Sequence, residues 1–565
     1  MSAVVRAKPK FYEASLFMQS FVKALLLVVL SLLMSCRSES DEDTRTVFNY
    51  NEMNGVSSLD PAAASNFENI APVNQLFNGL VQMDDSLNVI PCIATGYSIS
   101  PDGLRYTFSL RQDIYFHDNP CFENAKGRKV TAGDFVFSFN RLYDSKVSSA
   151  GSLLENIDRG ERSNYKGFDA LNDSTLIICL KTPFSAFVNI LTMKYFSVIP
   201  LEAIEYYKQD FRRNPVGTGP FVFKSWQEGT KLILLKNQNY FERDTGNVAL
   251  PYLDAVTVSF IKDRETAFME LLNAKFDMLS GADAFNTNEV LDKEGNLREF
   301  YKKKFYLQKE TFLKTDYIGI VVDENLPMVQ NSPLRLRALR QAINYGFDRD
   351  KLVKYLRNNI GKAAHAGFIP PGLKSYDSIL VKGYHYQPNK TAELLRDAGY
   401  PNGKGLPEIT LHTTENYKEQ VEFIQSQLAE NNIKTQISVE KTTVLRQAVA
   451  GCEYLMFKKS WVADYADEEN FMSLFYSKNF CPQGVNFFHY RNAEFDSLFE
   501  KALIENDSYH KRKLYQRMDQ LVVEDAPVIT LFYDEVVRLV GHQIKGLRTN
   551  PMNLLNLKTV RKSKN

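Results

Sequence analysis

One segment of the sequence combines aromatic rings with a carboxylate in a way that suits ligand binding. Residues 461–467 read WVADYAD, and in them Trp461 and Tyr465 flank Asp464. A carboxylate in such a setting can pair with a cation on a ligand. Lys458, three residues before Trp461, could carry its charge to the same crevice. The alternatives are that Trp461 packs in the core and that Lys458 is a solvated lysine at the end of a strand.

Asp464 and the acids that follow it also permit a second interpretation, which is catalysis. Asp464 with Asp467 or Glu468 would suit the paired carboxylates of a glycoside hydrolase, although Asp467 and Glu468 also read as solvated loop acids. The sequence contains no HExxH and no GxSxG, and residues 399–404 (GYPNGK) are one residue short of a phosphate-binding loop. The seven histidines form no pair at helical spacing. Apart from the carboxylate pair, which stays open as an alternative, these residues contain no catalytic signature, and we expect no cofactor and no metal.

The residues before this segment predict where it lies in the fold. They alternate between helix and strand patterns, which implies parallel strands with helices on the faces of the sheet. In such sheets ligands bind beyond the carboxyl ends of the strands, and residues 461–467 follow the last strand. The expected elements are helix 391–398, strand 408–413, helix 418–430, strand 435–440, helix 444–450 and strand 454–458.

Short helices and strands interleave over the rest of the chain, as expected when a chain crosses several times between two lobes. A turn at residues 101–103 (PDG) between alternating sequences predicts a hairpin. Thr131 and Asp134 form a capping-box pattern that starts a helix. A second helix is expected from Ser332. Further strands are expected at 47–50, 221–224 and 232–235.

Composition indicates an ordinary globular protein. The chain has 565 residues, of which 44% are hydrophobic and 24% charged, with a mean hydropathy of −0.30. This length corresponds to about three to four domains. The net charge of +1 creates no field that would attract nucleic acid, so no nucleic-acid partner is expected.

The N-terminus has the pattern of an export signal. Lys23 precedes an apolar run at 24–34 that is too short to span a bilayer but fits a signal peptide. Residues 33–36 (LMSC) resemble a bacterial lipobox, which predicts a lipid anchor on Cys36. An ordinary signal peptide with a chance cysteine is the alternative. The true start is Met1 or Met18.

The residues that follow Cys36 form a polar, acidic tether, 37–43, that cannot pack a core. It resembles the export signal of surface lipoproteins in Bacteroidetes-type bacteria. Five other cysteines remain, so at least one thiol is free or paired with another molecule. A disulfide between Cys452 and Cys481 is one option, and the sequence does not decide it.

Seven segments in order along about residues 46–545 resemble one protein family. Each is weak alone, but their order over most of the chain is specific. They are 58–61 (SLDP), 76–80 (LFNGL), 99–108 (ISPDGLRYTF), 130–139 (VTAGDFVFSF), 215–221 (PVGTGPF), 339–345 (LRQAINY) and 488–492 (FHYRN). The chain is thus similar to solute-binding proteins of ABC importers of the dipeptide/oligopeptide-binding type, family 5 of the bacterial extracellular solute-binding proteins.

This resemblance implies an α/β fold that is a periplasmic-binding-protein-like clamp of two lobes, type II-like with an extra domain. Mixed sheets flanked by helices form the lobes, and the ligand lies in the cleft between them. The implied division is signal peptide 1–35, lipidated cysteine and tether 36–45, lobe I at 46–80, 206–315 and 531–565, extra domain 81–205, and lobe II at 316–530.

The resemblance also implies roles for individual residues. The family's Trp-x-x-Asp-Tyr segment matches Trp461, Asp464 and Tyr465, and in oligopeptide-binding members its aspartate pairs with the α-ammonium of the peptide. Lys458 occupies the position of a basic residue that pairs with the ligand carboxylate in some members, although lysine is a softer match than arginine. Asn486 matches a polar position near the ligand.

We therefore expect a lipid-anchored monomer outside the cytoplasm that captures peptides and delivers them to an ABC permease. The resemblance implies no chemistry on the ligand, so we expect no enzyme activity. It would face the periplasm, or lie on the outer-membrane surface in a Bacteroidetes-type bacterium. The alternatives are the same scaffold binding a nickel chelate, haem or an oligosaccharide, and a surface adhesin that has lost transport. Asp464 favours a ligand with a free ammonium group, and hence a peptide.

Overall fold

The computed structural model describes residues 45–160 and 167–563 and shows the expected mixed α/β fold. Residues from Val47 onward form one unit. The predicted signal peptide and Cys36 lie outside the described residues. Within the described ranges, no helix is both long and apolar enough to cross a membrane.

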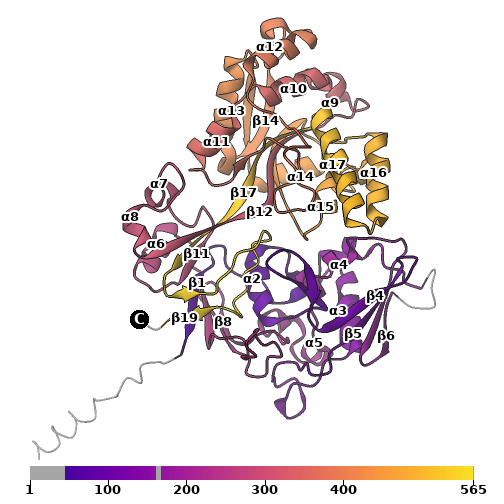
Figure 1. Cartoon of the computed structure of the whole chain (residues 1–565), viewed down its shortest axis with the longest axis vertical. Helices are drawn as coiled ribbons and strands as arrows, with labels where there is room; N and C mark the ends of the chain where they lie inside the picture. The colour runs from indigo at the N-terminus through magenta and orange to yellow at the C-terminus, as the bar shows by residue number, and fades with distance from the viewer. Residues whose placement is uncertain (1–44, 161–166, 564–565) are drawn as a thin grey trace, which may run out of the picture. The chain divides into compact units, whose positions relative to one another are not determined.

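A mixed sheet of eleven strands organises this unit (Figure 1). Its two longest strands, β12 (Phe305–Ile320) and β17 (Val528–Gly541), lie next to each other in the middle. We call the part built on the strands beyond β17 lobe I, and the part built on the strands beyond β12 lobe II. Lobe I contains β1 (Val47–Asn51), β8 (Phe221–Gln227), β9 (Lys231–Lys236), β10 (Ala255–Ser259) and β11 (Met278–Ser280), and lobe II contains β14 (Ile409–Thr414), β15 (Thr435–Glu440) and β16 (Met456–Val462). The eleventh strand, β13 (Lys362–Ala363), pairs with β17 outside this order.

The two long strands carry the chain from one lobe to the other. The start of β12 pairs with the end of β17 in lobe I, and the end of β12 pairs with the start of β17 in lobe II. The register of this antiparallel ladder shifts between Thr311 and Thr315, which marks the crossing. The predicted domain boundaries after residues 315 and 530 fall inside these strands, so the chain changes lobe in mid-strand.

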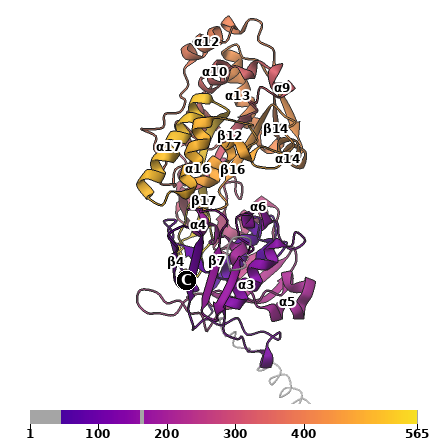
Figure 2. The same cartoon turned by 90° about the vertical axis from the view of Figure 1, so that its right-hand side faces the viewer.

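Alternate side chains of the lobe II strands enter two cores on opposite faces of the sheet. Ile318 and Met456 join one core, whereas their neighbours Tyr317 and Phe457 join the other, as the two-residue period of a strand requires. Figures 1 and 2 show α16 (Ala493–Ile504) and α17 (Ser508–Asp525), which cover the second core, side by side. The first core is covered by α10 (Arg337–Tyr345), α11 (Arg349–Leu356), α12 (Pro388–Asp397) and α13 (Lys418–Glu430), and the second by α14 (Thr442–Ala450), α16 (Ala493–Ile504) and α17 (Ser508–Asp525).

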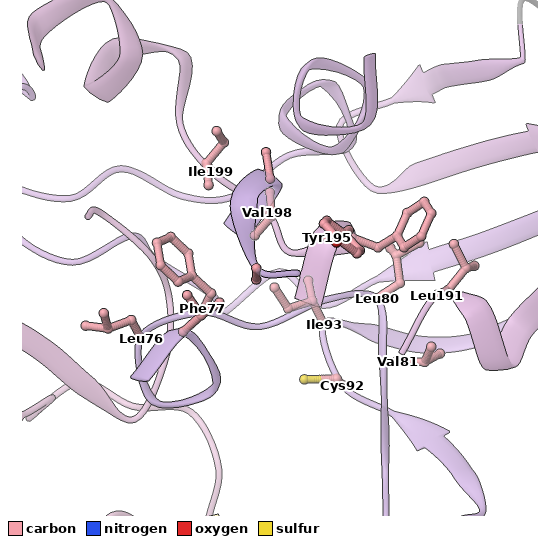
Figure 3. Close-up of a cluster of buried hydrophobic side chains, with 14 of the residues drawn as sticks. Leu76, Phe77, Leu80, Val81, Cys92, Ile93, Leu191, Tyr195, Val198 and Ile199 are labelled. Atoms are coloured by element: carbon pink, nitrogen blue, oxygen red, sulfur yellow. The ribbon is translucent and has the colours of Figure 1, made fainter. Parts of the chain in front are cut away.

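Lobe I shares one continuous core with a second, four-stranded antiparallel sheet. Figure 3 shows part of this core, where side chains such as Phe77, Ile93 and Val198 meet. The second sheet lies within the predicted extra domain, 81–205. Its elements are β4 (Ala94–Ile99), β5 (Arg105–Leu110), β7 (Thr175–Cys179) and β6 (Phe168–Asn172), and the adjoining elements are α2 (Phe67–Leu76), the hairpin β2 (Val81–Met83) and β3 (Val89–Pro91), α3 (Ala132–Asn140) and α5 (Leu201–Tyr207). Short helices α6 (Arg264–Leu272), α7 (Thr287–Val290) and α8 (Glu299–Lys302) cover β11.

Local sequence signals predicted most of these elements correctly. The hairpin around residues 101–103 is confirmed, as is the capping box of Thr131 at the start of α3. The parallel pairing of β14 with β15 and β16 is also confirmed. The helix expected from Ser332 begins only at Arg337, because 333–335 form a separate 3-10 turn.

Candidate functional site

The carboxyl end of β16 forms the centre of the candidate site. The strand runs to Val462, farther than predicted, because its pairing with β12 continues past Trp461. Asp464 therefore lies just beyond the strand end. It lines a pocket of about 770 Å³ that opens to solvent. Both lobes line this pocket, lobe I and its second sheet with Ser65, Asn66, Thr192, Lys194 and Tyr195, and lobe II with Val462, Ala463 and Asp464.

Asp464 brings an unpaired negative charge to this pocket. Its Oδ2 accepts one long hydrogen bond, 3.5 Å from Nδ2 of Asn470. No lysine, arginine or histidine of the described ranges forms an ion pair with it. The residue faces the open pocket, yet the surrounding protein desolvates it enough to raise the pKa of its carboxyl, an effect that Asn470 partly opposes. Such a carboxylate gains most from a cation that the ligand supplies.

Trp461 positions the loop that carries Asp464. Its indole Nε1 donates a hydrogen bond of 3.0 Å to Oδ1 of Asn470. The same oxygen accepts one of 3.2 Å from the backbone N–H of Asp464. Asn470 belongs to α15 (Glu469–Met472), and the sequence analysis missed it because only the fold of the loop brings it back to Trp461.

Tyr465 anchors this loop rather than lining the pocket. Its side chain is buried in the core of lobe I, and its hydroxyl donates a hydrogen bond to Oε2 of Glu469. Burial raises the pKa of the Glu469 carboxyl to about 7, although the bond from Tyr465 opposes this shift. Trp461 therefore ties the loop to lobe II, and Tyr465 ties it to lobe I.

Two residues that the sequence placed near the ligand have internal partners instead. Lys458 is fully buried, with Nζ 2.6 Å from Oδ1 of Asp316 in β12. Asn486 is also fully buried, and its amide donates to the backbone carbonyls of Tyr476 and Tyr490 at 3.0 and 2.9 Å. Neither residue lines the pocket of Asp464. Both therefore stabilise lobe II, and we leave them out of the proposed binding site.

Lys194 supplies a positive charge that sequence reasoning missed. It lines the same pocket as Asp464 from the other lobe. In the part of the chain that the structure describes, no carboxylate pairs with it. Burial lowers the pKa of its ammonium to about 8. Lys194 also lines an adjoining space with Cys92 and Lys558, whose charges act on its ammonium. The pocket of Asp464 is thus lined by one acid and one base, neither with an ion-pair partner among the described residues.

The other acids of this loop face a different pocket. Asp467 and Glu468 line a separate space of about 1140 Å³ that Asp464 does not line. Asp467 accepts hydrogen bonds from Nζ of Lys511 at 2.9 Å and from Nδ2 of Asn189 at 3.0 Å. Because Asp464 and Asp467 line separate pockets, they do not form the converging carboxylate pair that glycoside hydrolysis needs.

Two lobes joined by crossing strands, with a charged pocket lined from both, define a solute-binding protein of the clamp type. Comparison with known proteins supports this class. Residues 88–480 match the family described as "bacterial extracellular solute-binding proteins, family 5", in its middle region. The chain belongs to this family.

Relatives and solved structures extend the likeness to most of the chain. The glutathione-binding protein GsiB of Salmonella typhi is 28% identical over 501 residues, which cover 87% of this chain and 90% of GsiB. The periplasmic binding protein DppA of Helicobacter pylori, solved with the peptide STSA, is 28% identical with a TM-score of 0.73 and covers 93% of this chain and 99% of DppA. HbpA2 of Haemophilus parasuis has the same fold, with a TM-score of 0.78 at 22% identity, covering 92% of this chain and all of HbpA2.

Proposed function

We propose that this chain is a receptor outside the cytoplasm that captures peptides with a free amino terminus and delivers them to an ABC permease. The observation that carries the proposal is Asp464, a carboxylate without a cation partner in a pocket that both lobes line. The α-ammonium of a peptide is the cation that such a group would bind. The α-ammonium is present in every peptide with an unblocked amino terminus. Its contact with Asp464 would therefore fix the position of the ligand without selecting its side chains.

Lys194 extends this proposal to the other charge of the ligand. A short peptide is a zwitterion, and its terminal carboxylate would pair with the ammonium of Lys194. The lobes would then close on a ligand that bridges them, because Lys194 and Asp464 line the pocket from different lobes. Lys458, in contrast, is already neutralised by Asp316.

The relatives support the same ligand class. DppA of Helicobacter pylori was solved with a peptide, and GsiB is named for glutathione, which is itself a small peptide with a free α-ammonium. We further propose that the receptor is a monomer, held at the membrane through a lipid on Cys36.

Titration calorimetry with matched peptides tests the proposal. Short peptides with a free amino terminus should bind, and their N-acetylated forms should bind at least about tenfold more weakly. Equal affinity for the two forms would refute the role of Asp464. Binding of a nickel chelate, haem or an oligosaccharide, with no peptide bound, would refute the ligand class.

Anchoring needs an experiment of its own. The wild-type protein should fractionate with membranes when it is expressed in a bacterium that processes lipoproteins. A Cys36→Ser variant should be released into the soluble fraction. Recovery of both proteins in the soluble fraction would contradict the anchor and leave the peptide proposal untouched.

A further inference from the structure

Three metal-ligating side chains meet in lobe II, outside the peptide pocket. Cys452 lies just after α14, whereas Cys481 and His489 lie on the segment that leads to α16. One ligand atom from each, the two Sγ atoms and a ring nitrogen, lies within 4.8 Å of the others. Around a tetrahedral zinc ion, bonds of about 2.0–2.3 Å place neighbouring ligand atoms roughly 3.3–3.8 Å apart. A small contraction would bring these three atoms to that geometry.

The imidazole of His489 is oriented as a ligand would be. Its Nε2 lies 2.9 Å from the backbone carbonyl oxygen of Cys481, so Nε2 donates, and in the neutral imidazole Nδ1 then presents its lone pair. Nδ1 is buried and has no hydrogen-bond partner among the described residues. The ring also stacks on Phe480, with centroids 4.4 Å apart. A metal-bound histidine has the same arrangement, because its other ring nitrogen donates to a carbonyl or carboxylate.

Asp323 lies beside His489, outside the group of three close ligand atoms, and is the nearest candidate for a fourth donor. Its Oδ2 lies 3.6 Å from Nδ1 of His489, too far for a hydrogen bond. Its Oδ1 is already used, because it accepts from the backbone N–H of Asn325 at 3.0 Å. A carboxylate oxygen therefore faces the lone pair of an imidazole, an arrangement of two acceptors that a cation between them would stabilise.

The two cysteines have properties that suit ligands. The thiols of Cys452 and Cys481 interact with each other, so both sulfur atoms lie together in this cluster. The thiolate is the form that binds metal. Cys452 also has a left-handed backbone, with a φ of 60°, at a position after a helix where glycine or asparagine is usual. Keeping a cysteine there costs stability, which points to a use for its side chain.

We propose that Cys452, Cys481 and His489 bind a zinc ion, whose fourth position Asp323 would reach through a movement of its side chain. Two thiolates, an imidazole and a carboxylate suit Zn²⁺, whereas the oxygen donor suits a softer ion such as Cu⁺ less well. Binding would release the protons of both thiols to solvent. The ion would tie together the exit of β12, the end of α14 and the segment before α16, and so stabilise lobe II independently of the peptide pocket.

Cobalt spectroscopy of the purified protein, reduced and freed of metal, tests the site. One equivalent of Co²⁺ should produce thiolate-to-cobalt charge-transfer bands in the near ultraviolet and the visible bands of a tetrahedral site. Zn²⁺ should remove these bands. Cys452→Ser, Cys481→Ser and His489→Gln should each weaken cobalt binding by about tenfold or more. Cys121→Ser, which removes a half-buried thiol elsewhere, should leave the spectrum unchanged.

Peptide affinity measured on each variant shows that it is folded, because the pocket of Asp464 lies elsewhere. A folded, reduced wild-type protein without charge-transfer bands would overturn the proposal. So would bands that persist in both cysteine variants. A Cys452–Cys481 disulfide in the protein from its native host, with no cobalt site after reduction, would show that the pair is a redox crosslink instead.

Discussion

Replacement of Asp464 by asparagine is the sharpest perturbation of the proposed peptide site. Asparagine has nearly the same shape and can keep the contacts to Asn470, so the change removes a charge and little else. The carboxylate has no ion-pair partner to lose within the described chain. We therefore expect the folded protein to be as stable as the wild type or slightly more stable, because a desolvated charge disappears.

The size of the effect follows from the pairing that is lost. At about 3 Å and an effective dielectric constant of about 20, a carboxylate and an ammonium attract by roughly 5.5 kcal/mol. Desolvation offsets much of this attraction, and hydrogen bonds to charged groups contribute about 1.5–3 kcal/mol net. Asp464→Asn should therefore weaken the binding of free-amine peptides by about ten- to a hundredfold.

Calorimetry with a peptide and its N-acetylated form provides the assay. The wild type should prefer the free amine, and Asp464→Asn should abolish this preference because it lowers affinity for the free amine alone. Asp113→Asn is a matched control, since Asp113 is exposed and pairs with Arg111 at 2.7 Å away from the pocket. A variant that keeps the full preference for the free amine would refute the reasoning.

Acidity should reproduce the effect of this substitution, and three further residues give independent predictions. The affinity of the wild type should fall as the pH drops through the raised pKa of Asp464, which neutralises at a higher pH than an ordinary aspartate, and calorimetry across pH 4–7 checks this. Lys194→Gln should weaken peptides with a free carboxylate and spare C-terminally amidated ones, as a comparison of the two forms would show. Lys458→Met should lower the free energy of unfolding in denaturant by roughly 1.5–3 kcal/mol and leave peptide affinity unchanged, because it removes one of the two lysines that neutralise the buried Asp316 and leaves Lys314, 3.3 Å away, as the other. Burial alone would raise the pKa of Asp316, but Lys314 and Lys458 lower it from 3.8 to about 2, so its contribution to stability should be full above pH 4 and be lost as the pH falls towards 2 in acid unfolding.

Local sequence signals predicted many of the helices and strands correctly. The helix predicted at 418–430 and the strand at 435–440 have the observed bounds, because their apolar periodicity and flanking breakers act over a few residues. The end of β16 was misjudged, since its extension depends on pairing with β12, far away in the sequence. Element ends of this kind depend on tertiary partners that local sequence does not contain.

The residues of the candidate site likewise fall into those that a local sequence pattern predicts and those that only the fold brings together. Asp464 was predicted because a sequence pattern surrounds it, whereas Lys194 reaches the pocket from another lobe and has no signal near it. Lys458 looked like a charge free to bind a ligand, but its partner Asp316 lies 142 residues earlier in the chain. The cluster of Cys452 and Cys481 was likewise hidden, because no metal-binding spacing links the two residues.

Native mass spectrometry of the protein purified from its host would test the central claim most directly. The account predicts a series of adducts at the masses of short peptides, and their loss in the Asp464→Asn variant. It would be contradicted by a single adduct of another chemical class, such as a metal chelate or haem. It would equally be contradicted by a protein that carries no adduct and takes up none from a mixture of short peptides.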